Sequence, residues 1–220
     1  VVAATRDIPV VFTAVSDPLG AQLVSNFDKP GGNVTGLSDM SPVADHIKLI
    51  QEITPNAKTI GFVYNTAEAN SVSTLAAMKA EAEKAGLTIV ESVATKSSEV
   101  QGATRALIGR VDVIYIPTDN TIVSALEAAV GVAEEAKVPL YSGDTDSVAR
   151  GALASVSFNY FDVGRQTGEI VARVLKGEAP GDIPVRIAAG SDLVVNKKAA
   201  EKMGVTFSDD LVKRATKVVE

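Results

Sequence analysis

The 220-residue sequence has no cysteine, no tryptophan and a single histidine, His46. The absence of cysteine excludes disulfides and thiolate metal sites, and one histidine without such a partner cannot build a common zinc site. A Ser–His–Asp triad would have to depend on His46, which lies in a stretch of helical periodicity, Val43–Ile53. We expect His46 on the surface of this helix, and we expect neither a metal nor a cofactor.

Basic residues and long apolar runs are also scarce. The chain has 21 Lys and Arg against 27 Asp and Glu, a formal net charge of −6, so we expect no nucleic-acid partner. No apolar run reaches the length of a membrane span. The motifs GxGxxG, Walker A, HExxH, GxSxG and CxxC are missing. A glycosidase-type carboxylate pair stays open, but no pair stands out among the acidic residues.

The sequence alternates apolar strands with amphipathic helices, which predicts an α/β fold with parallel sheets and crossover helices. The expected strands are Pro9–Thr13, Thr59–Asn65, Thr88–Ala94, Val111–Pro117, Val138–Ser142 and Leu153–Phe158. The expected helices include one near Pro18, Val43–Ile53, Ser98–Gly109, Thr121–Ala136 and Asp162–Lys176. Ser98 and Gln101 form an expected capping box, and Gly86 and Gly177 are expected just past helix ends.

Polar residues follow the first expected strand. In open α/β sheets ligands bind beyond the carboxyl ends of strands, where this chain has Thr13, Ala14, Ser16 and Asp17. Their hydroxyls and backbone N–H groups are suited to a ligand carboxylate, helped by the N-terminus of the next helix. Ser16 or Asp17 is equally suited to cap a helix that begins at Pro18. The two roles are compatible, and both stay open.

Two later strands end in similar groups. Asn65 closes the strand TIGFVYN and is either a ligand contact or a turn residue. Thr118, Asp119 and Asn120 end the strongly apolar strand VDVIYI and begin a helix. They are suited to a charged ligand head group, but Asp and Asn are also favoured at turns and N-caps.

Three more residues complete the candidate site. Ser142 and Asp144 end the strand VPLYS, and a carboxylate there is suited to the ammonium group of an amino acid. Asp146 is a rival for that role, and a solvated loop is the alternative. Tyr160 is expected either to line the cleft and stack on an aromatic ligand or to pack at a hinge.

Five ordered segments carry a resemblance to a known family. They are FTAVSDP, KPGGNVTG, PTDN, GALASVSFNYFDVGRQTGEI and LKGEAPGDIPV. Together they resemble the substrate-binding proteins of ABC importers, in the subfamily linked to tryptophan and tyrosine uptake. The resemblance covers essentially all 220 residues, but members of the family carry several further β-α units before the strand IPVVFTA.

The resemblance implies a two-lobed, hinged fold of the type I periplasmic binding protein class, with one lobe incomplete. Expected lobe 1 comprises residues 1–36 and 157–182, and lobe 2 comprises residues 37–156 and 183–220. The expected ligand is a small molecule in the interlobe cleft, either an amino acid in general or an aromatic amino acid. The expected protein partner is an ABC permease in the membrane. The expected location is the bacterial periplasm or an extracellular membrane-anchored position. If these 220 residues are the whole molecule, we expect self-association or an unstable first lobe, because strand edges and apolar patches are exposed.

Two other classes remain as alternatives. A ligand-sensing regulatory domain of the same fold would be distinguished by a fused DNA-binding headpiece. An α/β enzyme would be distinguished by a phosphate-binding loop or a catalytic base. The substrate-binding protein is the hypothesis that the sequence favours.

Overall fold

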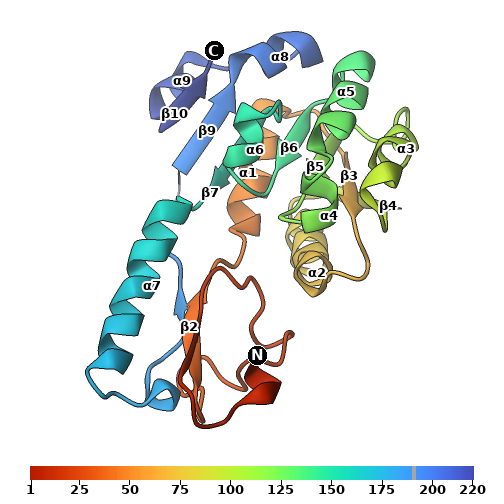
Figure 1. The fold of residues 1–220 in the computed structure, drawn as a ribbon. Helices are drawn as coiled ribbons and strands as arrows, with labels where there is room; N and C mark the ends of the chain where they lie inside the picture. The colour runs from red at the N-terminus through yellow and green to blue at the C-terminus, as the bar shows by residue number, and fades with distance from the viewer. Residues whose placement is uncertain (190–191) are drawn as a thin grey trace. The chain divides into compact units, whose positions relative to one another are not determined.

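The computed structural model describes residues 1–189 and 192–220, which fall into two compact units (Figure 1). Unit 1 contains Val1–Ser41 and Phe158–Gly190, and unit 2 contains Pro42–Ser157 and Ser191–Glu220. Each unit has buried hydrophobic clusters of its own. Parallel strands flanked by helices occur in both units, so the predicted α/β class is confirmed.

Unit 1 is built on a three-stranded parallel sheet in the order β1-β2-β8. Its elements are η1 (Val2–Ala4), β1 (Val10–Phe12), β2 (Val34–Ser38), α7 (Tyr160–Leu175), η3 (Pro180–Asp182) and β8 (Arg186–Ile187). Successive residues of a strand face opposite sides of the sheet. Leu37 packs with Val163 and Ile170 of α7, whereas Val34 packs with Phe12 beneath the loop that follows β1. The sheet is thus covered on both faces.

The start of unit 1 differs from the prediction in two places. No strand was expected at the lobe boundary after residue 36, but Val34–Ser38 forms the central strand β2. A Cβ on Gly36 would lie 2.3 Å from the carbonyl oxygen of Phe12, so only glycine permits this pairing. The helix predicted near Pro18 does not form. Turns replace it, with the N–H of Leu23 donating to the Pro18 carbonyl and that of Gly20 to the Asp17 carboxylate.

Unit 2 contains two sheets. A parallel sheet has the order β4-β3-β5-β6, and a mixed sheet has the order β10-β9-β7 with β7 antiparallel to β9. The strands are β3 (Thr59–Tyr64), β4 (Thr88–Val93), β5 (Val113–Ile116), β6 (Leu140–Ser142), β7 (Ala154–Ser157), β9 (Asp192–Asn196) and β10 (Lys217–Val219). The helices are α1 (Val43–Ile53), α2 (Ala69–Lys84), η2 (Ser97–Glu99), α3 (Val100–Arg105), α4 (Asn120–Val123), α5 (Leu126–Ala136), α6 (Asp146–Ala149), α8 (Lys197–Met203) and α9 (Asp209–Arg214).

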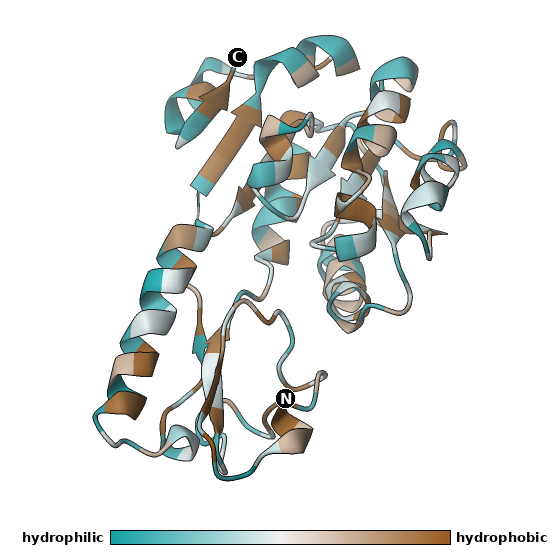
Figure 2. Cartoon of the chain, in the orientation of Figure 1, coloured by the Kyte–Doolittle hydropathy of each residue, from teal (hydrophilic) through white to brown (hydrophobic). Residues whose placement is uncertain are grey.

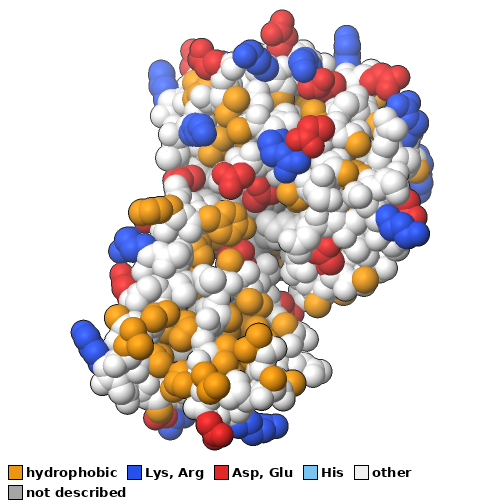
Figure 3. Space-filling model, viewed as in Figure 1, with side chains coloured by type: hydrophobic (Ala, Val, Ile, Leu, Met, Phe, Trp, Pro, Cys, Tyr) orange, Lys and Arg blue, Asp and Glu red, His pale blue; other side chains and the backbone are white. Residues whose placement is uncertain are grey.

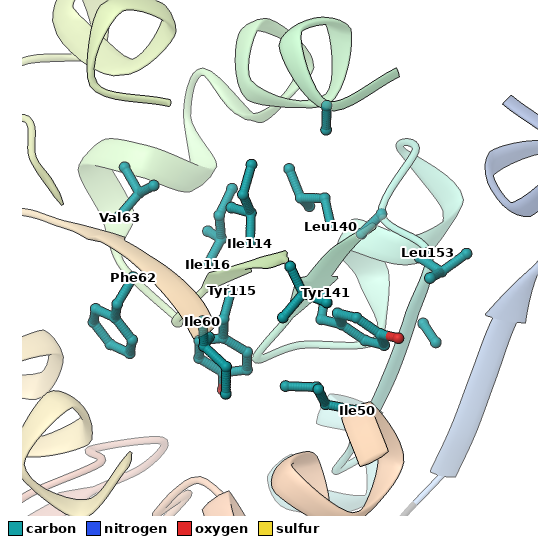
Figure 4. Packing of buried hydrophobic residues seen from close by; sticks show 14 of the residues in the cluster. Ile50, Ile60, Phe62, Val63, Ile114, Tyr115, Ile116, Leu140, Tyr141 and Leu153 are labelled. Atoms are coloured by element: carbon teal, nitrogen blue, oxygen red, sulfur yellow. The ribbon is translucent and has the colours of Figure 1, made fainter. Parts of the chain in front are cut away.

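The core of unit 2 lies around the parallel sheet. Phe62 on β3 stacks against Tyr115 on β5, with ring centroids 5.6 Å apart, and both side chains are fully buried. Figure 4 shows them among aliphatic side chains from neighbouring strands and from α1. The central strands β3 and β5 are almost entirely buried, as expected for parallel strands covered on both faces, and hydrophobic colouring runs through this part of the ribbon (Figure 2). The core therefore holds the carboxyl ends of β3, β5 and β6 in a fixed register.

Two helices of unit 2 are shorter than the apolar periodicity of the sequence predicts. The apolar face of Thr121–Ala136 predicts one helix, but the chain forms α4 and α5, separated where Ala125 leaves helical geometry at ψ 31°. The helix expected over Ser98–Gly109 ends at Arg105. The capping box of Ser98 and Gln101 does not form, and Glu99 instead accepts from the N–H and hydroxyl of Thr95. Gly86 and Gly177 do follow helix ends with positive φ, as predicted.

The two units differ from the expected lobes by a few residues. Leu37 and Ser38 pair with Arg186 and Ile187 of β8, so the chain stays in unit 1 beyond both expected boundaries. Residues 183–189, expected in lobe 2, likewise lie in unit 1, where Ile183 is fully buried. Because of this strand pairing, the boundaries between the two units lie at Ser41 and residue 190 rather than at residues 36 and 182.

Candidate functional site

In unit 1 the predicted site residues gather at the carboxyl end of β1. The hydroxyl of Thr13 lies 2.7 Å from that of Thr167 on α7. Ala14 has φ 51°, a left-handed conformation that costs a non-glycine residue energy and that often marks binding sites. Ser16 donates to Asp39 at 3.0 Å, and Asp17 accepts from the N–H of Gly20 at 2.8 Å. The structure thus brings Thr13, Ala14 and Ser16 together and places Asp17 in a turn.

Asp39 joins this group although the sequence did not mark it. It directly follows β2, whose carboxyl end lies beside that of β1, and only 8% of its surface is exposed. The hydroxyl of Tyr160, the first residue of α7, lies 3.4 Å from its second carboxylate oxygen. The signal for this strand is weak, the β-branched pair Val34 and Thr35 followed by Leu37 just before Asp39.

In unit 2 Asp119 is a structural centre rather than an open binding group. It is fully buried and accepts from the N–H of Asn65 at 2.7 Å, the hydroxyl of Ser71 at 2.6 Å and the N–H of Ile122 at 3.0 Å. Burial raises the pKa of the Asp119 carboxyl, and these donors oppose the shift. Asn65 is also committed, because its amide donates to Thr121 and accepts from the N–H of Ala67. The geometry thus displays the alternative role of each residue, an N-cap for Asp119 and a turn residue for Asn65.

Glu68 organises the other residues of this strand end. Its carboxylate accepts from the backbone and side chains of Asn120 and Thr121 at 2.8–2.9 Å. Burial opposes ionisation of Glu68, but these donors outweigh it and lower the pKa. Thr118 differs from its neighbours, since its carbonyl accepts from Asn70 but its half-buried hydroxyl bonds to none of the residues that the structure describes. Thr118 is therefore the predicted contact in this unit that is best placed to accept a new partner.

The loop after β6 packs tightly against the end of β5. A Cβ on Gly143 would lie 3.1 Å from both the Thr118 nitrogen and the Tyr115 hydroxyl oxygen, so glycine permits the approach. Ser142 is buried and donates to the Asp144 carbonyl at 2.9 Å. The Asp144 carboxylate accepts from the N–H and hydroxyl of Ser147 at 2.8 and 2.7 Å. The rival Asp146 is exposed at the start of α6.

The expectation that His46 lies on the surface is wrong, because the side chain is only 2% exposed. Its Nε2 lies 2.6 Å from the carbonyl oxygen of Val156, which only accepts, so Nε2 carries the proton. Nδ1 then accepts from the Tyr115 hydroxyl at 2.7 Å. Burial lowers the pKa of His46 to about 4 and raises that of Tyr115. His46 is thus a neutral structural bridge between α1, β5 and β7.

The described residues contain neither a cluster of metal-ligating side chains nor a membrane-spanning helix. No group of three or more His, Asp or Glu side chains there is placed to hold a metal ion. Within the same residues, no helix is both long and apolar enough to span a lipid bilayer. The strand-end groups described above are hydroxyls, amides and single carboxylates, which suit a small polar or zwitterionic molecule.

The chain has the α/β fold of the type I periplasmic binding proteins, with parallel strands flanked by helices. In open sheets of this kind, ligands bind beyond the carboxyl ends of the strands. Residues 1–219 match the ABC transporter substrate binding protein family, and the chain belongs to that family. This is a family of transporter binding components rather than enzymes.

Individual relatives agree with this assignment. A tyrosine-binding protein of Clostridioides difficile is 41% identical over 194 residues, which cover 88% of this chain and 56% of the relative. The chain thus spans about half the length of its curated relatives. A conserved domain protein from Vibrio cholerae has a TM-score of 0.94 at 50% identity, over 99% of this chain and 73% of the other. An ABC domain in complex with L-Trp from Streptococcus pneumonia has a TM-score of 0.93 at 40% identity, covering 99% and 74%.

Proposed function

We propose that this chain is the solute-binding component of an ABC importer and that it binds an aromatic L-amino acid. The observation that carries the proposal is the likeness of nearly the whole chain to the L-Trp-bound domain, together with strand-end polar groups in both units. A second relative, named as a tyrosine-binding protein, supports the same ligand class. Hydroxyls and N–H groups near Thr13, Ala14 and Thr118 hold the polar part of the ligand. Placement of the ligand in an interlobe cleft stays a prediction.

The partner follows from the same proposal. A substrate-binding component delivers its ligand to a membrane permease, so the protein acts outside the cytoplasm, in the periplasm or held at the outer face of the membrane. Domain closure on the ligand would create the surface that the permease recognises. The hypotheses of a regulatory domain and of an enzyme are less well supported, because the family match covers residues 1–219.

A thermal-shift panel of the twenty amino acids, followed by calorimetry, tests the ligand class. We expect tyrosine or tryptophan to raise the melting temperature most, because a ligand that binds only the folded state stabilises it. Absence of any shift across the panel would contradict the proposal.

A matched pair of variants locates the contact in unit 2. Thr118→Val removes a hydroxyl without a described partner, and we expect weaker binding with unchanged stability. Thr104→Val removes a fully buried hydroxyl that donates to the Val100 carbonyl, so it tests the effect of the substitution away from the site. Equal binding by both variants and the unmodified protein would exclude Thr118 as a contact.

A further inference from the structure

Asp39 is a buried carboxylate with no counter-charge among the residues that the structure describes. None of the ion pairs among residues 1–189 and 192–220 involves it. A carboxylate can accept about four hydrogen bonds. Asp39 has one good donor, the hydroxyl of Ser16 at 3.0 Å, and one long contact, the Tyr160 hydroxyl at 3.4 Å. Since burial of an unpaired charge is costly, a cationic partner would stabilise this group strongly.

The other strand-end carboxylates are already committed within unit 2. Asp119 accepts from three donors, one in the loop after β3, one in α2 and one in α4. Both oxygens of Asp144 are bound by Ser147, and Asp144 lies close enough to Arg150 to raise the pKa of that guanidinium together with Glu127. Asp144 was the candidate that the sequence favoured for an ammonium group, and the structure gives it a capping role. The two donors to Asp144 lie at 2.8 and 2.7 Å, whereas those to Asp39 lie at 3.0 and 3.4 Å, so Asp39 is the less tightly bound carboxylate.

A phenolic hydroxyl lies near the Asp39 carboxylate. Tyr160 is 39% exposed, and its hydroxyl oxygen lies 3.4 Å from one carboxylate oxygen, so this hydroxyl would be close to an ammonium group bound by Asp39. A hydrogen bond from an ammonium group to the carboxylate would be charge-assisted, and such bonds are stronger than neutral ones. All of these groups belong to unit 1, at the adjoining carboxyl ends of β1 and β2.

We infer that Asp39, with Ser16 and Tyr160 beside it, is the group in this chain that binds the ligand's ammonium. The inference rests on the proposed function and narrows it to ligands that carry a protonated amine. Desamino analogues, which keep the ring and the carboxylate, should then bind poorly.

Calorimetry with four ligands tests the inference: L-tyrosine, L-tryptophan and their desamino analogues, 3-(4-hydroxyphenyl)propanoate and indole-3-propanoate. The variants are Asp39→Asn, which keeps the shape but removes the charge, and Asp144→Asn as the matched control. We expect Asp39→Asn to weaken binding of both amino acids about 10- to 100-fold and to leave binding of both analogues unchanged. Asp144→Asn should lower thermal stability and retain the preference for the amino acids over the analogues.

The outcomes separate this inference from the proposed function. If the unmodified protein binds neither the amino acids nor the analogues, both fail. If it binds L-tyrosine but Asp39→Asn binds it equally well, or if the analogues bind as tightly as the amino acids, only the role of Asp39 fails. Should Asp39→Asn not fold, ¹³C NMR of aspartate carboxyl groups in the unmodified protein replaces it. L-tyrosine should then shift the Asp39 signal and the desamino analogue should not, whereas equal responses would overturn the inference.

Discussion

At the scale of single residues, His46 makes stability depend on pH. Its pKa in the folded protein is about 4 because of burial, against about 6.5 when unfolded. The unfolded state therefore binds the extra proton first, and the stabilisation present above pH 6.5 is lost as the pH falls toward 4. The groups around the ring are the Tyr115 hydroxyl, the Val156 carbonyl and the nearby Asp45, whose charge only partly opposes the shift.

We expect His46 to account for a loss of about 3 kcal/mol in the free energy of unfolding between pH 6.5 and 4. Urea denaturation of the unmodified protein and of His46→Gln across this range measures it. The amide of glutamine keeps a donor for the Val156 carbonyl but does not titrate, so the two curves should converge as the pH falls. Parallel curves would show that His46 does not titrate in this window.

Asp119 allows a direct test of the two roles left open by the sequence. Replacement by alanine leaves the buried hydroxyl of Ser71 and the N–H groups of Asn65 and Ile122 without an acceptor. We expect Asp119→Ala to lower the free energy of unfolding by about 3 kcal/mol or more. Asp146→Ala, at an exposed position, should cost little. A stable Asp119→Ala protein that fails to bind ligand would instead favour direct contact.

At the scale of elements, helix α5 ends on a residue whose backbone conformation is unfavourable for any residue with a Cβ atom. Lys137, the C-cap, has φ 53° in the left-handed region, where glycine avoids the penalty of a Cβ. We expect Lys137→Gly to stabilise unit 2 by about 0.5–1 kcal/mol, with Lys137→Ala as the control that keeps the Cβ. Thermal unfolding measures both. A loss of stability in the glycine variant would mean that the lysine side chain contributes more than the strain costs.

At the scale of the whole molecule, the two units differ greatly in core size. Unit 1 has two small buried clusters, whereas unit 2 has one large cluster around Phe62 and Tyr115. We therefore expect unit 1 to unfold first, with hydrogen exchange near Leu37 faster than near Phe62. Leu37→Ala should lower only the first calorimetric transition, and Phe62→Ala only the second. One transition, affected equally by both variants, would show that the units unfold together.

Exposed hydrophobic side chains are concentrated in the smaller unit. Of the eleven large hydrophobic residues exposed in the described chain, nine lie in unit 1, and Figure 3 shows such side chains gathered over its surface. On α7, Phe161 and Leu175 are each 82% exposed. Because apolar patches of this kind favour association, we expect the chain to self-associate and Phe161→Glu with Leu175→Glu to reduce it in sedimentation velocity. The matched control is Val72→Glu with Val93→Glu in unit 2, and equal effects of both pairs would exclude α7 as the contact.

The sequence by itself determined the α/β class, most of the strands and the family. Period-two and helical patterns are local, and buried parallel strands such as VDVIYI stand out because both faces are covered. It also located the strand ends where Thr13, Asn65, Thr118 and Ser142 lie. The sequence did not predict strand β2, because glycine is more typical of loops than of strands. Only the structure shows that Phe12 occupies the space that a Cβ atom on residue 36 would need.

Only the tertiary structure decided what each strand-end group is free to do. Asp119 and Asp39 are both aspartates beside a strand end, yet Asp119 accepts short hydrogen bonds from Asn65 and Ser71, far back in the sequence, whereas the one short donor to Asp39 is Ser16. His46 likewise looked like a surface residue until its partners, distant in sequence, enclosed it. Hydrogen-bond partners and burial depend on residues far along the chain, which local patterns do not contain.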